Sequence, residues 1–153
     1  MFKGIKNTYQ KSLGAVVAQN LLEMHARRFY LQIDAQMVAN RLVEAAWSEN
    51  EHLFDGRYGQ RPFKSSIAAA AFGKALRDRS EDFEQLCLYG MCLGTILQEI
   101  EVNGHRYPLN GIDLEILEKN AEVLRFFSED LENSQFGQEI GRILNAPDKG
   151  EHQ

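Results

Sequence analysis

The sequence predicts an all-α protein with five to six helices in a compact bundle or orthogonal array. Apolar residues recur in several segments at the three- and four-residue spacing of amphipathic helices, and no segment shows sustained alternation with period two. The 153 residues contain only three prolines, which leaves room for long helices. We expect a basic N-terminal lead over 1–7, a single helical domain over 8–145 and a polar, disordered tail over 146–153.

An uncharged stretch within 81–103 predicts the helix at the centre of the fold. No charged residue occurs from Leu86 to Leu97, and a helix that is apolar on all sides must be buried on all sides. The run is 12 residues long, whereas a membrane span needs about 20. Gly90 and Gly94 lie one turn apart, so another helix is expected to approach closely there, either within the chain or across a homodimer seam.

The two cysteines, Cys87 and Cys92, lie on this same stretch. Five residues apart on a helix, they point about 140° away from each other and cannot form a disulfide without breaking the helix. We therefore expect free thiols that act as small core residues in a reducing compartment. The apolar run near the N-terminus is too short for a signal peptide, which favours a cytoplasmic protein.

Caps and apolar spacing place the three helices before the central stretch. The first is expected from a cap at Thr8 to about Arg28, and the second opens at Asp34. A turn-rich loop over 55–62 comes next. Ser65 or Ser66 is then expected to cap a third helix. The alanine-rich face of this third helix is expected to pack against the glycine face of the central helix.

Two Asn-Gly turns and a proline separate the central helix from the next one along the chain. This fifth helix is expected to start at Asp113 and to run for roughly five turns. A last short helix is expected from Gln135 to Leu144.

Charge is distributed unevenly along the chain, whose formal net charge is −5. Residues 1–80 carry 12 basic against 7 acidic side chains, a balance of +5, and residues 81–153 carry 5 against 15, a balance of −10. The asymmetry predicts either a polarised surface or two halves that attract each other within the fold.

The loop over 57–64 is the first candidate contact site, because cations alternate there with aromatic residues. The residues are Arg57, Tyr58, Arg61, Phe63 and Lys64. Arginine and tyrosine are frequent at protein–protein hot spots, and cations with aromatics also suit nucleic acid. The negative net charge argues against nucleic acid. In the plainer alternative, Tyr58 and Phe63 fix an ordinary loop to the core while the charges are solvated.

The acidic face of the fifth helix is the second candidate contact site. Glu115, Glu118 and Glu122 lie on one side of it and create a negative field. Such a face can dock a basic partner, as an inhibitor, antitoxin or immunity protein does. The alternative is a solvated helix face.

Enzymatic and metal motifs are sparse. Glu49 and His52 form one E-x-x-H pair, the spacing used by di-iron bundles, but a second such pair is missing. No zinc, calcium or phosphate-binding motif is present in the sequence, and neither cysteine has a basic neighbour that would activate it. No cofactor is therefore expected.

These patterns favour a non-enzymatic, cytoplasmic interaction protein. It would act as an adaptor, a regulator or an antitoxin- or immunity-like inhibitor, and would bind a protein partner or a second copy of itself through a charge-polarised surface. One alternative is a small helical enzyme or metal-binding protein that uses Glu49 and His52. The other is a nucleic-acid-associated protein that uses the basic loop.

Overall fold

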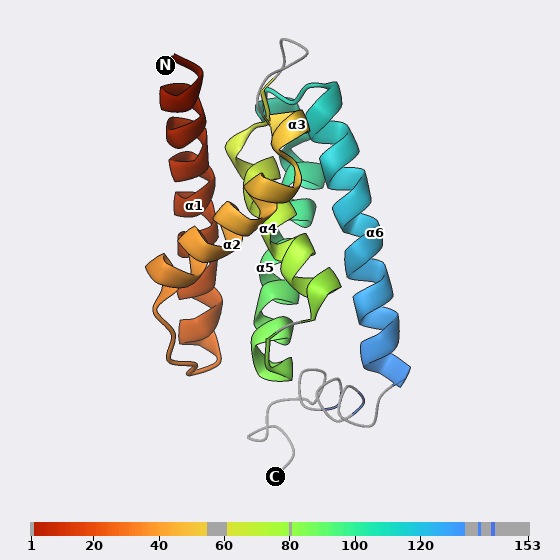
Figure 1. Cartoon of the computed structure of the whole chain (residues 1–153). Helices are drawn as coiled ribbons and strands as arrows, with labels where there is room; N and C mark the ends of the chain where they lie inside the picture. Colours follow the sequence, from red (N-terminus) through yellow and green to blue (C-terminus); the bar gives the residue numbers. More distant parts are fainter. Residues whose placement is uncertain (1, 55–60, 80, 134–137, 139–141, 143–153) are drawn as a thin grey trace.

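The computed structural model describes residues 2–54, 61–79, 81–133, 138 and 142. The predicted all-α class is confirmed: the described part contains helices and turns but no strand (Figure 1). The helices are α1 Phe2–Arg28, α2 Ala35–Glu49, α3 Glu51–Phe54, α4 Lys64–Asp78, α5 Phe83–Asn103, the short 3-10 helix η1 Gly104–Arg106, and α6 Gly111–Asn133. Of the predicted last helix, Gln135 to Leu144, only residues 138 and 142 are described, both as helical, and the predicted tail, 146–153, lies outside the described residues.

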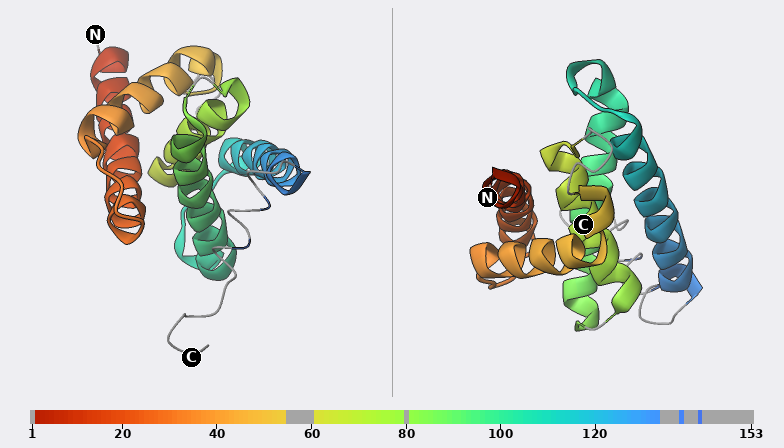
Figure 2. Two further views of the ribbon diagram at one scale, coloured as in Figure 1. Left: turned by 90° about the horizontal axis from the view of Figure 1, so that it is seen from below. Right: turned by 45° about the horizontal axis from the view of Figure 1, so that its top comes forward.

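The helix at the centre of the fold is α4 rather than α5. It packs against α1, α2, α5 and α6, and 11 of its 15 residues are buried. The views agree that α1 and α2 lie on one side of α4 and α6 on the other (Figures 1 and 2). On α5, by contrast, Cys87, Met91 and Leu97 are only half-buried. The prediction that 81–103 is the central helix is therefore corrected.

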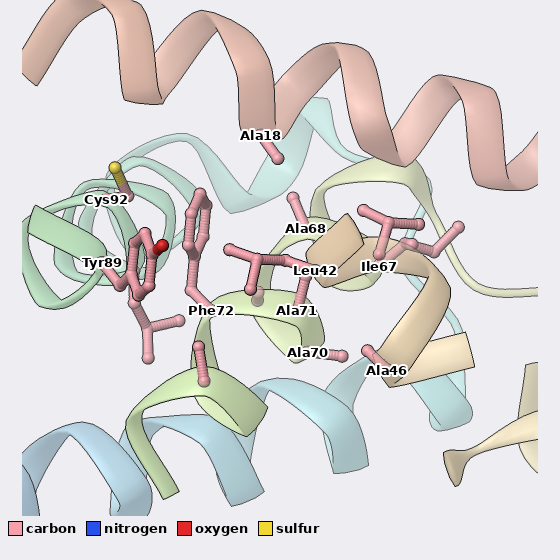
Figure 3. Packing of buried hydrophobic residues seen from close by; sticks show 14 of the residues in the cluster. Ala18, Leu42, Ala46, Ile67, Ala68, Ala70, Ala71, Phe72, Tyr89 and Cys92 are labelled. Carbon is pink, nitrogen blue, oxygen red and sulfur yellow. The ribbon is translucent and has the colours of Figure 1, made fainter. Parts of the chain in front are cut away.

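Small side chains explain why α4 can hold this place. Four consecutive alanines allow neighbouring backbones to come close from several directions, because no long side chain stands between the helices. Figure 3 shows the result as one continuous cluster of α4 residues between neighbours from other helices. It includes Ala68, Ala71 and Phe72 of α4, Ala18 of α1, Leu42 and Ala46 of α2, and Tyr89 and Cys92 of α5.

The glycine face of α5 packs on α6, not on the alanines of α4. A Cβ added to Gly90 would lie 3.4 Å from the Phe127 ring, and one added to Gly94 would lie 3.7 Å from a methyl of Leu124. The expected pairing with the alanine-rich helix is therefore wrong, although the glycines do face another helix of the same chain. Helix α4 packs against four helices, so its alanines do not form a face for α5 alone.

Two of the predicted caps are replaced by other arrangements. Asp34 caps α2 as predicted, since its Oδ1 accepts a hydrogen bond from the Met37 N–H at 3.1 Å. Ser65 and Ser66 do not cap α4, which begins at Lys64, and both serines are buried in its first turn. Likewise α1 begins at Phe2 instead of after Thr8.

A reciprocal pair of caps starts α6 and also fixes the chain before α4. The Asp113 N–H donates to Asn110 Oδ1 at 3.0 Å, and the Asn110 N–H donates to Asp113 Oδ2 at 2.9 Å. Asp113 Oδ1 also accepts the Phe63 N–H at 2.6 Å, and the Asn110 side chain donates to the Arg61 carbonyl at 2.8 Å. The start of α4 is therefore set by residues about 50 positions away in the sequence, which no local cap pattern can reveal.

Candidate functional site

The described end of the basic aromatic loop is anchored to the core. Arg57 and Tyr58 lie outside the described residues. The ring of Phe63 is half-buried and meets Tyr107 edge to face, with 5.4 Å between ring centroids. Lys64 is exposed, with its ammonium 5.9 Å from the centroid of the Phe63 ring. Arg61 is half-buried and tied to Asn110 through its carbonyl.

The acidic face of α6 is exposed as the sequence indicates. Glu115, Glu118 and Glu122 lie within an arc of about 60° around the helix axis, given 100° per residue. None of the three has a cation as ion-pair partner among the residues that the structure describes. Within the described ranges, five other carboxylates do form ion pairs, namely Glu44, Glu49, Asp78, Glu81 and Asp130.

The two predicted contact sites border the same end of the molecule. Phe63 hydrogen-bonds to Asp113, and Glu115 is only two residues further along α6. Glu115 also lines a cavity of about 290 Å³ together with Glu49, Arg77 and Lys119. This cavity contains acidic and basic side chains in equal number, so it favours no ligand of either charge.

The predicted E-x-x-H pair is not available as a unit. Glu49 forms an ion pair with Arg77, and Lys74 Nζ lies 3.7 Å from Glu49 Oε2. The side chain of His52 lies outside the described part. Within that part, no three metal-binding side chains cluster together. Glu49 thus holds α2 against α4.

Burial keeps both thiols protonated. It raises the pKa of Cys92 to about 12, and burial together with the nearby Glu84 raises the pKa of Cys87 to about 11. Both cysteines are free, as expected. Because the thiolate is the reactive form, neither is prepared to act as a nucleophile at neutral pH.

A larger cavity, which the sequence did not indicate, lies beside the start of α4. Its volume is about 480 Å³, and its wall comes from α1, the first turn of α4, the end of α5, and η1 with Tyr107. Tyr107 donates a hydrogen bond from its hydroxyl to Glu99 at 2.7 Å, and partial burial together with this carboxylate raises the pKa of Tyr107 to about 12. The mixture of cation and aromatic at Phe63 and Lys64 was the only sequence signal at this place.

No protein-family model matches this chain, and no curated protein or solved structure matches it either. In the part of the chain that is described, none of the helices is long and apolar enough to cross a bilayer. The geometry of its own surface and cavities is what supports a function.

Proposed function

We propose that this chain is a non-enzymatic, cytoplasmic interaction protein that docks a basic protein surface on the outer face of α6. One observation carries the proposal: Glu115, Glu118 and Glu122 share one arc of the helix, are exposed, and have no ion-pair partner within the described part. Unpaired charges of one sign attract and orient a partner of opposite charge, mainly through the association rate and the specificity.

Selective pairing elsewhere supports this choice of surface. Arg79 of α4 pairs with Asp130 near the end of α6, and Arg41 of α2 pairs with Glu81 at 2.6 Å. The basic first half and the acidic second half thus attract each other in part, as one alternative expected. The three glutamates in the first half of α6 take no part in these ion pairs.

Apolar side chains flank the acidic arc. Leu114 is 59% exposed and Phe126 is 53% exposed, and the helical period places them on either side of the glutamates. Exposed apolar anchors beside charges are the usual composition of a protein-binding surface, in which the apolar groups supply most of the affinity. The anchored end of the basic aromatic loop, Arg61 to Lys64, borders the same end of α6 and is proposed as a second contact.

Native mass spectrometry of the chain, purified gently from its own host, tests the proposal. The test variant is Glu115→Lys/Glu118→Lys/Glu122→Lys. The matched control, Glu51→Lys/Glu84→Lys/Glu101→Lys, changes the net charge equally at exposed positions off this face. We expect a stoichiometric second polypeptide, or a multiple of the 17.5 kDa chain mass, with the wild type and the control but not with the test variant.

Salt gives a second readout, since a charge-steered complex weakens as ionic strength rises. A bound polypeptide that the test variant retains as fully as the control would contradict the proposal. So would a wild-type chain that is always a bare monomer. Circular dichroism of each variant confirms that the helices are intact.

A further inference from the structure

The cavity beside α4 has an aliphatic wall on one side. Val17 and Leu21 of α1 face it, and so do Ile96 and Ile100 of α5. A volume of about 480 Å³ falls within the range of about 300–1,000 Å³ that is typical of small-molecule sites. The wall therefore suits a ligand with an apolar body.

Another part of the lining is the start of α4, where some backbone N–H groups have no acceptor among the described residues. Phe63 precedes the first turn and provides no side-chain cap. Its carbonyl accepts from the N–H groups of Ser66 and Ile67, at 2.9 and 3.2 Å. The N–H groups of Lys64 and Ser65 have no acceptor among the described residues, and both residues line the cavity. A helix start with free N–H groups attracts an anion.

The side chain of Ser65 is a second, separate sign of a ligand. Ser65 is only 9% exposed and lines the cavity, and its hydroxyl has no hydrogen-bond partner in the described structure. The Ser65 oxygen is not among the fully enclosed side-chain atoms that lack a partner, so it is open to the cavity and can bond an outside acceptor or donor there.

Charges at the rim favour an anionic ligand. Lys64 and Arg106 are both exposed at the rim, and neither forms an ion pair within the described part. The single carboxylate in the lining, Glu99, accepts a hydrogen bond from the Tyr107 hydroxyl. The buried carboxylate of Asp113 accepts hydrogen bonds from the N–H groups of Phe63 and Asn110 and does not line the cavity.

We propose that this cavity binds a small amphipathic carboxylate. The carboxylate accepts hydrogen bonds from the Lys64 and Ser65 N–H groups and from the Ser65 hydroxyl, with Lys64 and Arg106 beside it. The aliphatic body lies against Leu21, Ile96 and their neighbours. This site lies apart from the acidic face of α6 and shares only Phe63 and Lys64 with the proposed second protein contact, so octanoate binding by the purified chain tests it separately from the protein partner.

Titration of the ¹⁵N-labelled full chain with sodium octanoate tests the proposal. We expect saturable binding in the millimolar range or tighter, with the largest amide shifts at Lys64 and Ser65. Octanol and octylamine carry the same alkyl chain without the anion and are expected to bind at least about tenfold more weakly.

Variants separate the two halves of the site. Lys64→Gln/Arg106→Gln is expected to weaken octanoate binding by about tenfold, because exposed cations contribute only modestly, and to leave octanol binding unchanged. The control Lys119→Gln/Arg125→Gln removes the same charge from α6 and is expected to have no effect. Leu21→Trp, at a half-buried wall position, fills the cavity and is expected to abolish binding of both ligands.

Three results would overturn the proposal. They are no saturable octanoate binding, equal affinity for octanoate and octanol, and the same affinity in the Lys64/Arg106 variant as in its control.

Discussion

Helix α4 and helix α5 meet their neighbours in different ways. The contacts of α4 are too close for any added atom: a Cβ on Gly14 of α1 would lie 2.8 Å from Ile67 Cβ, and one on Gly73 would lie 2.7 Å from Asn120 Cγ. The glycines of α5 instead have ordinary van der Waals space in front of them, 3.4 Å at Gly90 and 3.7 Å at Gly94. The two helices therefore use the same residue type to different effect.

Polar contacts, rather than close packing, mark the sides of α5. His25 of α1 lies 2.9 Å from the Thr95 hydroxyl, and Arg41 of α2 pairs with Glu81 just before the helix begins. The comparison shows that the apolar character of a helix does not decide whether that helix lies at the centre of the fold. The most apolar helix of this chain is held partly by polar groups, whereas the helix of small residues is packed on all sides.

Gly14→Ala should destabilise the protein more than an alanine at Gly73 or Gly94. The new Cβ would clash with Ile67 Cβ, which is attached directly to the backbone of α4 and cannot rotate away. We expect a loss of about 3 kcal/mol in the free energy of unfolding, measured by urea denaturation. Gly104→Ala is the control, because nothing lies within 4 Å of its added Cβ. An equal, small effect for both variants would remove the distinction between α4 and α5.

Gly73→Ala should cost less, about 2 kcal/mol, because Asn120 can swing aside. That movement breaks the hydrogen bond from the buried Asn120 amide to the Ile116 carbonyl, 2.7 Å in length. In an Asn120→Ala background the clash is relieved, since the remaining Cβ is 3.4 Å away. A double-mutant cycle should therefore show strong coupling. Additive effects would mean that α6 moves as a whole instead.

Gly94→Ala should instead raise the free energy of unfolding and so stabilise the protein. Alanine gains roughly 0.5–1 kcal/mol over glycine inside a helix, and a distance of 3.7 Å to Leu124 leaves room for the methyl. The same urea experiment measures it. Destabilisation by this substitution would show that α5 and α6 are as tightly packed as α4 and its neighbours.

Acidification should lower the stability of the fold through His25, which lies at the polar contact between α1 and α5. The Thr95 hydroxyl donates to the Met91 carbonyl at 2.9 Å, so it accepts from Nε2–H of His25, and the buried Nδ1 has no partner among the described residues. Burial first, and then Arg28, lower the pKa of His25 from its ordinary value of 6.5. Below pH 6.5 the unfolded chain binds a proton at His25 that the folded chain does not bind, so the free energy of unfolding decreases as the pH is lowered. The decrease ends once the pH is below the lowered pKa of His25 in the folded state.

Urea unfolding between about pH 7.5 and about pH 5.5 measures this loss. His25→Gln has no titrating group at that position and should show a smaller decrease over the same interval. Thr95→Val removes the acceptor but keeps the histidine, so its pH dependence should remain. Identical pH profiles for the wild type and His25→Gln would contradict the assignment.

Sequence reasoning succeeded where the deciding contact is local. Asp34 caps α2 through a residue three positions away, and the exposed acidic face of α6 results from the helical period alone. It failed at Ser65 and Ser66 because the group that fixes the start of α4, the Asp113 carboxylate, is distant in the sequence. The large cavity could not be predicted either, because its wall joins Val17, Ser65 and Arg106 from separate segments.

The sequence by itself determined the all-α class, the five long helices to within a few residues at most ends, and the two unpaired cysteines. These properties come from hydrogen bonds and side-chain periods that repeat within a few residues. Only the tertiary structure decided that α4 lies at the centre, that Gly14 and Gly73 have no space for a side chain, and that Ser65 lines a cavity. Those properties depend on which helix faces meet, and close packing fixes that choice for the whole chain at once.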